Sequence, residues 1–269
     1  MKANSTAAMA RRHPDRGGDG MTAKLDLGGA PEIEVALPKG AGAVMASRAS
    51  AGVMPEAAKG LDFFPTPPWA ARAGAELIKQ IQPNARTCWD PACGAGHMVH
   101  GLRDYFPGGV AASDIADHGA GLDGWDELDF LHPAAERWCA AWGRPDWIVT
   151  NPPFRDGAAF IRQAWKLAGR GVAMLLRTQF IESAERHALF TGDCPLGVFA
   201  PFSERVPMVA GRWDPDASSA TSYAWFICDK AMTFREPVVR LIGPGTRARL
   251  TKPGDLAAFG MDETGGLDV

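Results

Sequence analysis

Apolar residues recur with a helical period in the first strongly patterned stretch of this 269-residue chain. Between residues 68 and 82 they stand four apart, at Trp69, Ala73, Leu77 and Ile81. A spacing of four places these side chains on one face of an α-helix. The pattern therefore predicts a helix over 68–82 that buries this face.

Shorter apolar runs beyond this helix have the length of β-strands, and helical patterns separate several of them. Strands are expected over 87–90, 110–114, 147–150, 172–176, 197–199 and 223–228, and further helices over 96–105, 158–167 and 182–190. Strands that alternate with helices indicate an α/β fold, with a mostly parallel sheet and helices on both faces.

The two ends of the chain lack such a pattern. Residues 1–60 are rich in Ala, Gly and small polar residues, which predicts a disordered N-terminal extension. The letters HPD at 13–15 resemble the loop of J-domain cochaperones, but the residues before them are too few for the helix that a J-domain needs. Gly and Pro predict a flexible C-terminal tail over 244–269. The folded domain is therefore expected over 61–243.

Composition narrows the possible functions. Hydrophobic residues make up 46% of the chain, enough for a full core, and the net charge of −3 is not typical of a nucleic-acid binder. Five Cys without a CxxC pair argue against a zinc site or a disulfide framework and favour reduced thiols in a cytoplasmic protein. No apolar run approaches the ~20 residues of a membrane span, and the N-terminus lacks the apolar segment of a signal peptide.

The stretch DWIVTNPPF at 146–154 joins a predicted strand to an unusual polar and aromatic terminus. Pro152 and Pro153 end the strand and stiffen the backbone, because proline has a fixed φ and no N–H. Asn151 and Phe154 are thereby held in fixed positions at the strand end. A plain strand-ending turn is the alternative explanation of these four residues.

Two other predicted strands end in an acid. The first leads into DPACGAGH at 90–97, a Gly-rich turn that lets a ligand approach the backbone at a helix N-terminus. Its spacing lacks the third Gly of a dinucleotide site, and Asp90 suits a ligand with a cationic end. Asp114 ends the next strand, where an acid holds ribose hydroxyls. Asp129 could accept a hydrogen bond from an exocyclic amine, and Phe130 could stack on a purine ring. Helix capping by Asp90 and a surface turn at Asp114 are the simpler roles.

Ribose, adenine and a positive centre together point to S-adenosylmethionine. With these motifs the chain resembles the class I S-adenosylmethionine-dependent methyltransferases, and among them the N6-adenine-specific DNA methyltransferases of phage and prophage type. The resemblance covers about residues 61–230, from FFPTP at 63–67 through DPACGAG and DF to NPPF. It implies a Rossmann-like, seven-stranded, mostly parallel sheet with an antiparallel last strand.

The resemblance also implies roles for individual residues. Expected to bind the cofactor are Phe64, Thr66, Asp90, Ala92, Gly94, Gly96, Asp114, Ile115, Asp129, Phe130 and Asn151. Expected to act in catalysis are Asn151, Pro152, Pro153 and Phe154. No metal is implied, because the sulfonium activates its own methyl group.

The chemistry of an exocyclic amine explains the catalytic set. The lone pair of such a nitrogen is delocalised into the ring, so it is a poor nucleophile. Hydrogen bonds accepted from its two N–H groups, by the side chain of Asn151 and the carbonyl of Pro152, favour a more nucleophilic tetrahedral nitrogen. Phe154 can stack on a base flipped out of a duplex.

The sequence names the acceptor atom more firmly than the acceptor molecule. DNA is the first expectation, RNA or a protein glutamine amide the enzymatic alternatives, and a non-catalytic cofactor-dependent binder a different class. Residues 61–150 carry 6 Lys/Arg against 12 Asp/Glu, whereas 151–243 carry 11 against 9. The mildly basic second half could meet phosphates.

The segment 203–215 is either a substrate-contacting loop or a structural hairpin. No separate recognition domain is evident, so a specificity partner is an open possibility.

Overall fold

The computed structural model describes residues 22–25, 33–36, 61–119, 122, 124–217, 219–232 and 236–259. It divides into two units, residues 1–48 and 49–269. In the first unit the described part is the backbone of an antiparallel hairpin, β1 (Thr22–Leu25) and β2 (Ile33–Ala36). The HPD letters at 13–15 lie outside the described residues. The disordered extension over 1–60 stays a prediction.

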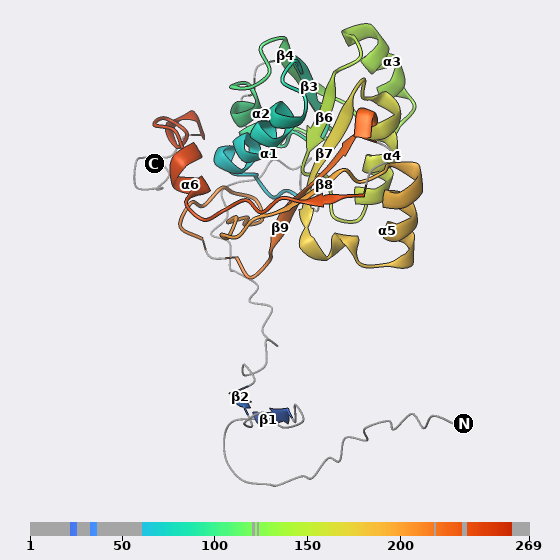
Figure 1. Cartoon of the computed structure of the whole chain (residues 1–269). Coiled ribbons are helices and arrows are strands. Elements are labelled where there is room, and N and C mark those ends of the chain that lie inside the picture. The colour runs from blue at the N-terminus through green and yellow to red at the C-terminus, as the bar shows by residue number, and fades with distance from the viewer. Residues whose placement is uncertain are drawn as a thin grey trace, which may run out of the picture. The chain divides into compact units, whose positions relative to one another are not determined.

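The second unit is built around an eight-stranded sheet (Figure 1). Its strands are β3 (Thr87–Asp90), β4 (Gly109–Asp114), β5 (Trp125–Glu127), β6 (Trp147–Thr150), β7 (Gly171–Arg177), β8 (Val198–Pro201), β9 (Tyr223–Asp229) and β10 (Val238–Val239). They lie in the order β10-β8-β9-β7-β6-β3-β4-β5. All neighbours are parallel except that β9 is antiparallel to both β7 and β8.

This sheet confirms the predicted α/β, Rossmann-like class and corrects its strand count from seven to eight. The additional strand, β10, has two residues and adds to the edge beside β8. The antiparallel strand is therefore β9, and β10 after it runs parallel to β8. Strands as short as β5 and β10 carry too few residues for a period-two pattern, so the sequence did not reveal them.

Helices cover both faces of the sheet, as predicted (Figure 1). The helices are α1 (Pro68–Ile81), α2 (His97–Leu102), α3 (Ala134–Trp142), α4 (Gly157–Leu167), α5 (Ala184–Ala188) and α6 (Thr246–Leu250). Short turns complete the unit at η2 (Thr178–Ile181), η3 (Leu189–Asp193), η4 (Lys230–Met232) and η5 (Ala257–Phe259). Of the longer helices, α3 was not predicted. It is Ala-rich, and only Ala135 and Cys139 on it are buried.

Two hydrophobic cores follow from the alternation of side chains along the strands. On β6, Trp147 and Val149 face α1 and α2, whereas Ile148 faces α3 and α4. The next strand shows the same alternation, with Ala173 in the first core and Met174 in the second. Buried on both faces, the central strands read as continuous apolar runs, which is why the sequence reveals them.

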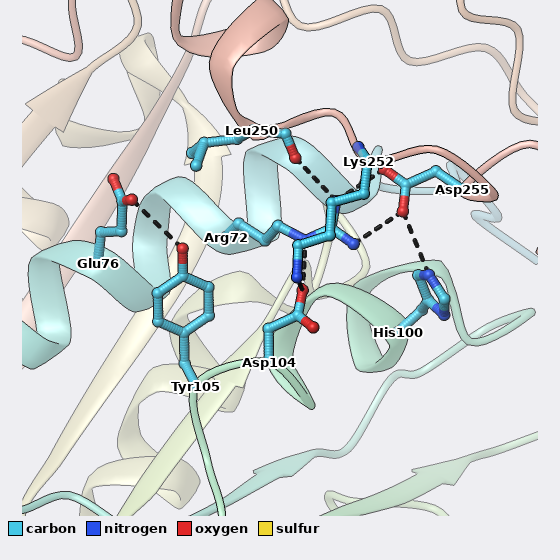
Figure 2. Close-up of polar contacts among 8 residues, drawn as sticks. All are labelled: Arg72, Glu76, His100, Asp104, Tyr105, Leu250, Lys252 and Asp255. Atoms are coloured by element: carbon cyan, nitrogen blue, oxygen red, sulfur yellow. Dashed lines mark hydrogen bonds and ion pairs between the residues drawn. The ribbon is translucent and has the colours of Figure 1, made fainter.

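The C-terminal segment 244–259 is packed on α1 and α2, and this differs from the predicted flexible tail. A buried ion pair fastens it: the guanidinium of Arg72 on α1 donates to both carboxylate oxygens of Asp255 at 2.7 Å (Figure 2). Arg72 also donates to Asp104 at 2.6 Å and to the carbonyl of Leu250 at 2.8 Å. His100 on α2 contacts Asp255 at 3.2 Å. Residues 260–269 lie outside the described part.

Candidate functional site

A cavity of about 320 Å³ opens at the carboxyl ends of β3, β4 and β6. Strand order reverses at β3, which lies between β4 and β6, and open α/β sheets bind ligands at such a switch point. Thirteen of the predicted site residues line it: Phe64, Thr66, Asp90, Ala92, Gly94, Asp114, Ile115, Asp129, Phe130, Asn151, Pro152, Pro153 and Phe154. Gly96 is the predicted residue that does not.

The Gly-rich turn after β3 requires glycine at two positions. Gly94 and Gly96 have positive φ values of 52° and 83°, a conformation that L side chains rarely adopt. A Cβ on Gly94 would also lie 2.7 Å from the ring of Phe63. Gly96 lies under Leu122 and precedes α2, so it shapes the turn without reaching the cavity.

Asp90 lies at the end of β3 and is almost fully buried, at 1% exposure. One carboxylate oxygen accepts from the N–H of Ala92 at 3.3 Å, and the other, Oδ2, has no hydrogen-bond partner within the described residues. Burial raises the pKa of Asp90 to about 7. Interactions with Thr150 and Ala92 act to lower this pKa, and the nearby charge of Asp114 raises it further. A buried, unsatisfied acceptor of this kind is suited to a cationic ligand group.

Asp114, at the end of β4, is tied into the turn. Its Oδ2 accepts from the N–H of Gly94 at 2.7 Å, and its Oδ1 accepts from Ala116 at 3.4 Å and contacts His118 at 3.2 Å. These contacts already use most of a carboxylate's acceptor capacity of about four sites. Asp114 therefore braces the Gly-rich turn, with limited capacity left for ligand hydroxyls.

The residues expected around adenine differ in how they meet the cavity. Ile115 is 52% exposed, so its apolar side chain can cover a ligand face. Asp129 accepts from the N–H of Leu131 at 2.9 Å. The ring of Phe130 is buried between Trp89 (5.1 Å between centroids) and Phe160 (5.0 Å), in the second core. Phe130 is thus largely a core side chain with one edge at the cavity.

Asn151 follows β6 directly, and its two amide ends have contrasting surroundings. The Nδ2 group lies 3.2 Å from the carbonyl of Phe64, 3.1 Å from the hydroxyl of Thr66 and 3.8 Å from the sulfur of Met208. The Oδ1 atom is buried and has no partner within the described residues. Leaving such an acceptor unpaired costs about 1–3 kcal/mol, which a donor from a ligand would recover.

The proline pair fixes the backbone beyond Asn151. The carbonyl of Pro153 accepts from the N–H of Asp156 at 3.1 Å, whereas the carbonyl of Pro152 receives no hydrogen bond from any described residue. The Pro152 carbonyl and Asn151 Oδ1 are thus two neighbouring acceptors at one strand end, both without a donor.

Phe154 lies between an aromatic ring and a cation. Its ring is 4.9 Å from that of Phe64, and the guanidinium of Arg177, at the end of β7, lies 4.1 Å from its centroid. Guanidinium groups stack on aromatic faces much as planar bases do. A base that stacked on this face of Phe154 would have to displace Arg177.

Sequence reasoning assigned no individual role to three side chains around this cavity, His118, His97 and Met208. His118 stacks on Phe63 with centroids 4.5 Å apart, and His97 is buried beside Trp213. Met208 reaches Asn151. The position of His97 directly after the Gly-rich turn was a usable signal, whereas nothing local marks His118 or Met208.

The segment 203–215 forms the predicted hairpin, and its role as a substrate-contacting loop stays a prediction. A tight antiparallel bridge between Val209 and Arg212 makes it a hairpin. It also reaches the cavity region, because Met208 contacts Asn151 and the N–H of Gly211 donates to the carbonyl of Phe63 at 2.8 Å. The hairpin therefore packs on the 63–66 stretch and on the end of β6.

The described residues form neither a metal-binding cluster nor a membrane-spanning helix. In the part of the chain that the structure describes, no cluster of three or more His, Cys, Asp or Glu side chains is placed to hold a metal ion. None of the described helices is both long and apolar enough to cross a bilayer.

Comparisons with known proteins give structural likenesses only. No protein-family model and no curated protein matches the sequence. A magnesium protoporphyrin IX methyltransferase from Synechocystis with bound SAM is 12% identical, with a TM-score of 0.41 over 60% of this chain and 78% of the other. A predicted O-methyltransferase from Agrobacterium tumefaciens is 16% identical (TM-score 0.42; 65% and 85% covered). An rRNA methyltransferase from Streptomyces viridochromogenes is 14% identical (TM-score 0.38; 61% and 86%). Likenesses at this level identify neither a substrate nor a reaction.

Proposed function

We propose that this chain transfers the methyl group of S-adenosylmethionine to an exocyclic amino nitrogen, and that the acceptor is N6 of adenine in DNA. The observation that carries the proposal is the buried Oδ1 of Asn151, followed in the chain by the carbonyl of Pro152, neither of which has a hydrogen-bond donor among the described residues. Two acceptors held without donors at one strand end suit a group that brings two N–H donors, and an exocyclic amine is such a group.

The other end of the cavity fits the cofactor. The Gly-rich turn carries no side chain at Gly94, which lines the cavity, so a ligand can approach the protein backbone closely there. Asp90 offers an unpaired buried oxygen to a cationic group. Ile115 offers an apolar surface to the adenine, and Asp129 offers a carboxylate to its amine. When bound, the cofactor supplies an electrophilic methyl group on a sulfonium.

The chain's own residues would act on the acceptor. Asn151 Oδ1 and the Pro152 carbonyl accept the two N–H bonds of the amine, which turns its lone pair toward the methyl carbon. With the amine held in this way, its nitrogen would bond to the methyl carbon, and the electron pair of the broken sulfur–carbon bond would stay on the sulfur of a neutral thioether product. The proton leaves the product amine afterwards, so no strong base is required.

A nucleic-acid base is favoured over a protein amide as the acceptor by the aromatic and cationic groups near the cavity. Phe154 and Arg177 form a planar stack that a flipped base could replace. Arg155 lines the cavity, and neither it nor Arg177 forms an ion pair with a carboxylate of the described residues. Cations that form no ion pair near a cavity suit backbone phosphates.

The test is transfer of tritiated methyl from S-adenosylmethionine to unmethylated genomic DNA, total RNA and cell protein. Label recovered from DNA as N6-methyladenine supports the proposal. Label confined to RNA or protein keeps the site and replaces the acceptor. No transfer to any pool, with cofactor binding intact, refutes the enzymatic proposal for the isolated chain and favours a binder or a missing partner.

Asn151→Ala is the variant that tests the mechanism. Loss of one preorganised hydrogen-bonding group is expected to lower kcat about 100-fold or more, with cofactor affinity nearly unchanged. Asn84→Ala is a matched control, because Asn84 is exposed and lies outside the lining of the cavity. Equal turnover in the Asn151 and Asn84 variants would refute the role of the amide.

A further inference from the structure

The orientation of the Asn151 amide is set by three acceptors around its NH2 group. They are the carbonyl of Phe64 at 3.2 Å, the hydroxyl of Thr66 at 3.1 Å and the more distant sulfur of Met208 at 3.8 Å. A carbonyl oxygen can only accept, so the amide end that faces Phe64 must be the donor end. The Oδ1 end therefore points away from this cluster.

The opposite orientation would reverse the chemistry of the site. A flipped amide would set its oxygen against the Phe64 carbonyl, acceptor against acceptor. It would also present N–H groups where an acceptor is needed. The substrate amine brings N–H donors of its own, so it would meet donors instead of the unpaired Oδ1. Which amide end faces the acceptor amine thus decides whether Asn151 can promote methyl transfer.

We propose that Thr66 is a positioning residue that holds the Asn151 amide with its oxygen toward the acceptor amine. This inference rests on the proposed function and assigns Thr66 a role other than the cofactor contact that the motif implies. The Phe64 contribution comes from the backbone, which substitution cannot remove. Of the two side chains, the Met208 sulfur is the weaker and more distant acceptor.

The stretch around Thr66 is built to hold its hydroxyl still. Pro65 precedes it, Pro67 follows it as the residue that caps α1, and Pro68 begins that helix. Proline fixes φ and restricts the residue before it, so Thr66 is constrained from both sides. The Thr66 side chain is also buried, at 4% exposure. A hydroxyl fixed in this way can orient a neighbour without loss of side-chain entropy during catalysis.

The oxygen held in this orientation is buried and has no hydrogen-bond partner within the described residues. The Thr66 hydroxyl and the Phe64 carbonyl anchor the NH2 end, so a substrate donor would meet the oxygen end. Thr66 is thus expected to affect the methyl-transfer step more than cofactor binding.

The test compares Thr66→Val with Thr66→Ser in the full chain. Valine keeps the shape and removes the acceptor, whereas serine keeps the hydroxyl. With saturating cofactor and DNA, kcat of Thr66→Val is expected to fall about 10- to 100-fold, as for a misplaced catalytic group. Cofactor Kd should stay within about twofold, and Thr66→Ser should retain kcat within about threefold. Should the valine variant not fold, Thr66→Ala provides the same comparison.

Hydrogen exchange at the Asn151 side-chain amide tests the contact without relying on activity. Its ¹⁵N-bound protons, assigned by their loss in Asn151→Ala, should exchange slowly in the wild type and about tenfold or more faster in Thr66→Val. The exposed amide of Asn84 is the internal reference. If the wild type methylates no acceptor, the proposed function fails, and this exchange measurement alone decides whether Thr66 orients Asn151.

Two results would overturn the proposal. One is an unchanged kcat and an unchanged exchange rate in Thr66→Val. The other is a raised cofactor Kd with normal kcat at saturation, which would make Thr66 a cofactor ligand as the motif implies.

Discussion

Cofactor affinity is predicted to rise steeply with pH below neutrality, because of the buried carboxyl of Asp90. Burial raises its pKa to about 7, so the group is mostly neutral at pH 5 to 6. The amino and sulfonium groups of S-adenosylmethionine favour the ionised carboxylate. Binding at acidic pH must therefore expel a proton, and the cost of that proton weakens the affinity.

The size of the effect follows from the ionised fraction of Asp90. With a pKa of about 7, this fraction is about 1% at pH 5 and about half at pH 7. If only the ionised form binds, affinity should increase about 50-fold across this range. The cofactor's own amino group should titrate near pH 8, as α-amino groups do, so it stays charged throughout. Close to one proton should be released per cofactor bound at pH 5 to 6.

Isothermal titration calorimetry measures both quantities. Titrations at pH 5, 6 and 7 give the affinity, and a pair of buffers with different ionisation enthalpies gives the proton count. Asp90→Asn is the control, since it should bind more weakly at pH 7 and show no pH dependence. A wild-type affinity that stays flat from pH 5 to 7, or an equal slope in Asp90→Asn, would refute the reasoning.

Two further predictions concern the C-terminal segment and the cavity edge. Asp255→Ala strands the buried guanidinium of Arg72, which Asp104 only partly compensates, so the free energy of unfolding should fall by about 3 kcal/mol in urea titrations. A loss below about 0.5 kcal/mol would show that the pair does not fasten the segment. When Arg155 and Arg177 are both replaced by Gln, the plot of log affinity for DNA against log salt should become less steep, its slope falling in magnitude by about two. An unchanged slope would mean that neither meets a phosphate.

The parts that the sequence predicted share one physical basis. Asp90, Asp114 and Asn151 lie far apart in the chain, but each ends a strand that is buried on both faces. Parallel strands of one sheet bring their carboxyl ends to one edge, so the order of the motifs was enough to place them together. The same reasoning failed where an element is short, as with β5 and β10, because two or three residues hold no period.

Other features escaped prediction because their cause lies far away in the chain. The segment 244–259 has the composition of a tail, yet Asp255 is fixed by an arginine 183 residues earlier. Local pattern carries no information about such a partner. Thr66 shows a related limit: the motif marks it as part of the site, but only the geometry shows that its hydroxyl contacts Asn151.

The C-terminal segment also reaches the helix that follows the Gly-rich turn. His97 begins α2 directly after Gly96, and its ring stacks on Phe259 with centroids 3.8 Å apart and planes at 10°. Burial lowers the pKa of His97 to about 3, so the imidazole is neutral near pH 7 and the stack carries no charge. Phe259 stands four residues after Asp255, which Arg72 holds in place. The packing of the segment therefore restrains the residue that follows the Gly-rich turn, and the buried ion pair contributes to the geometry of the cavity as well as to stability.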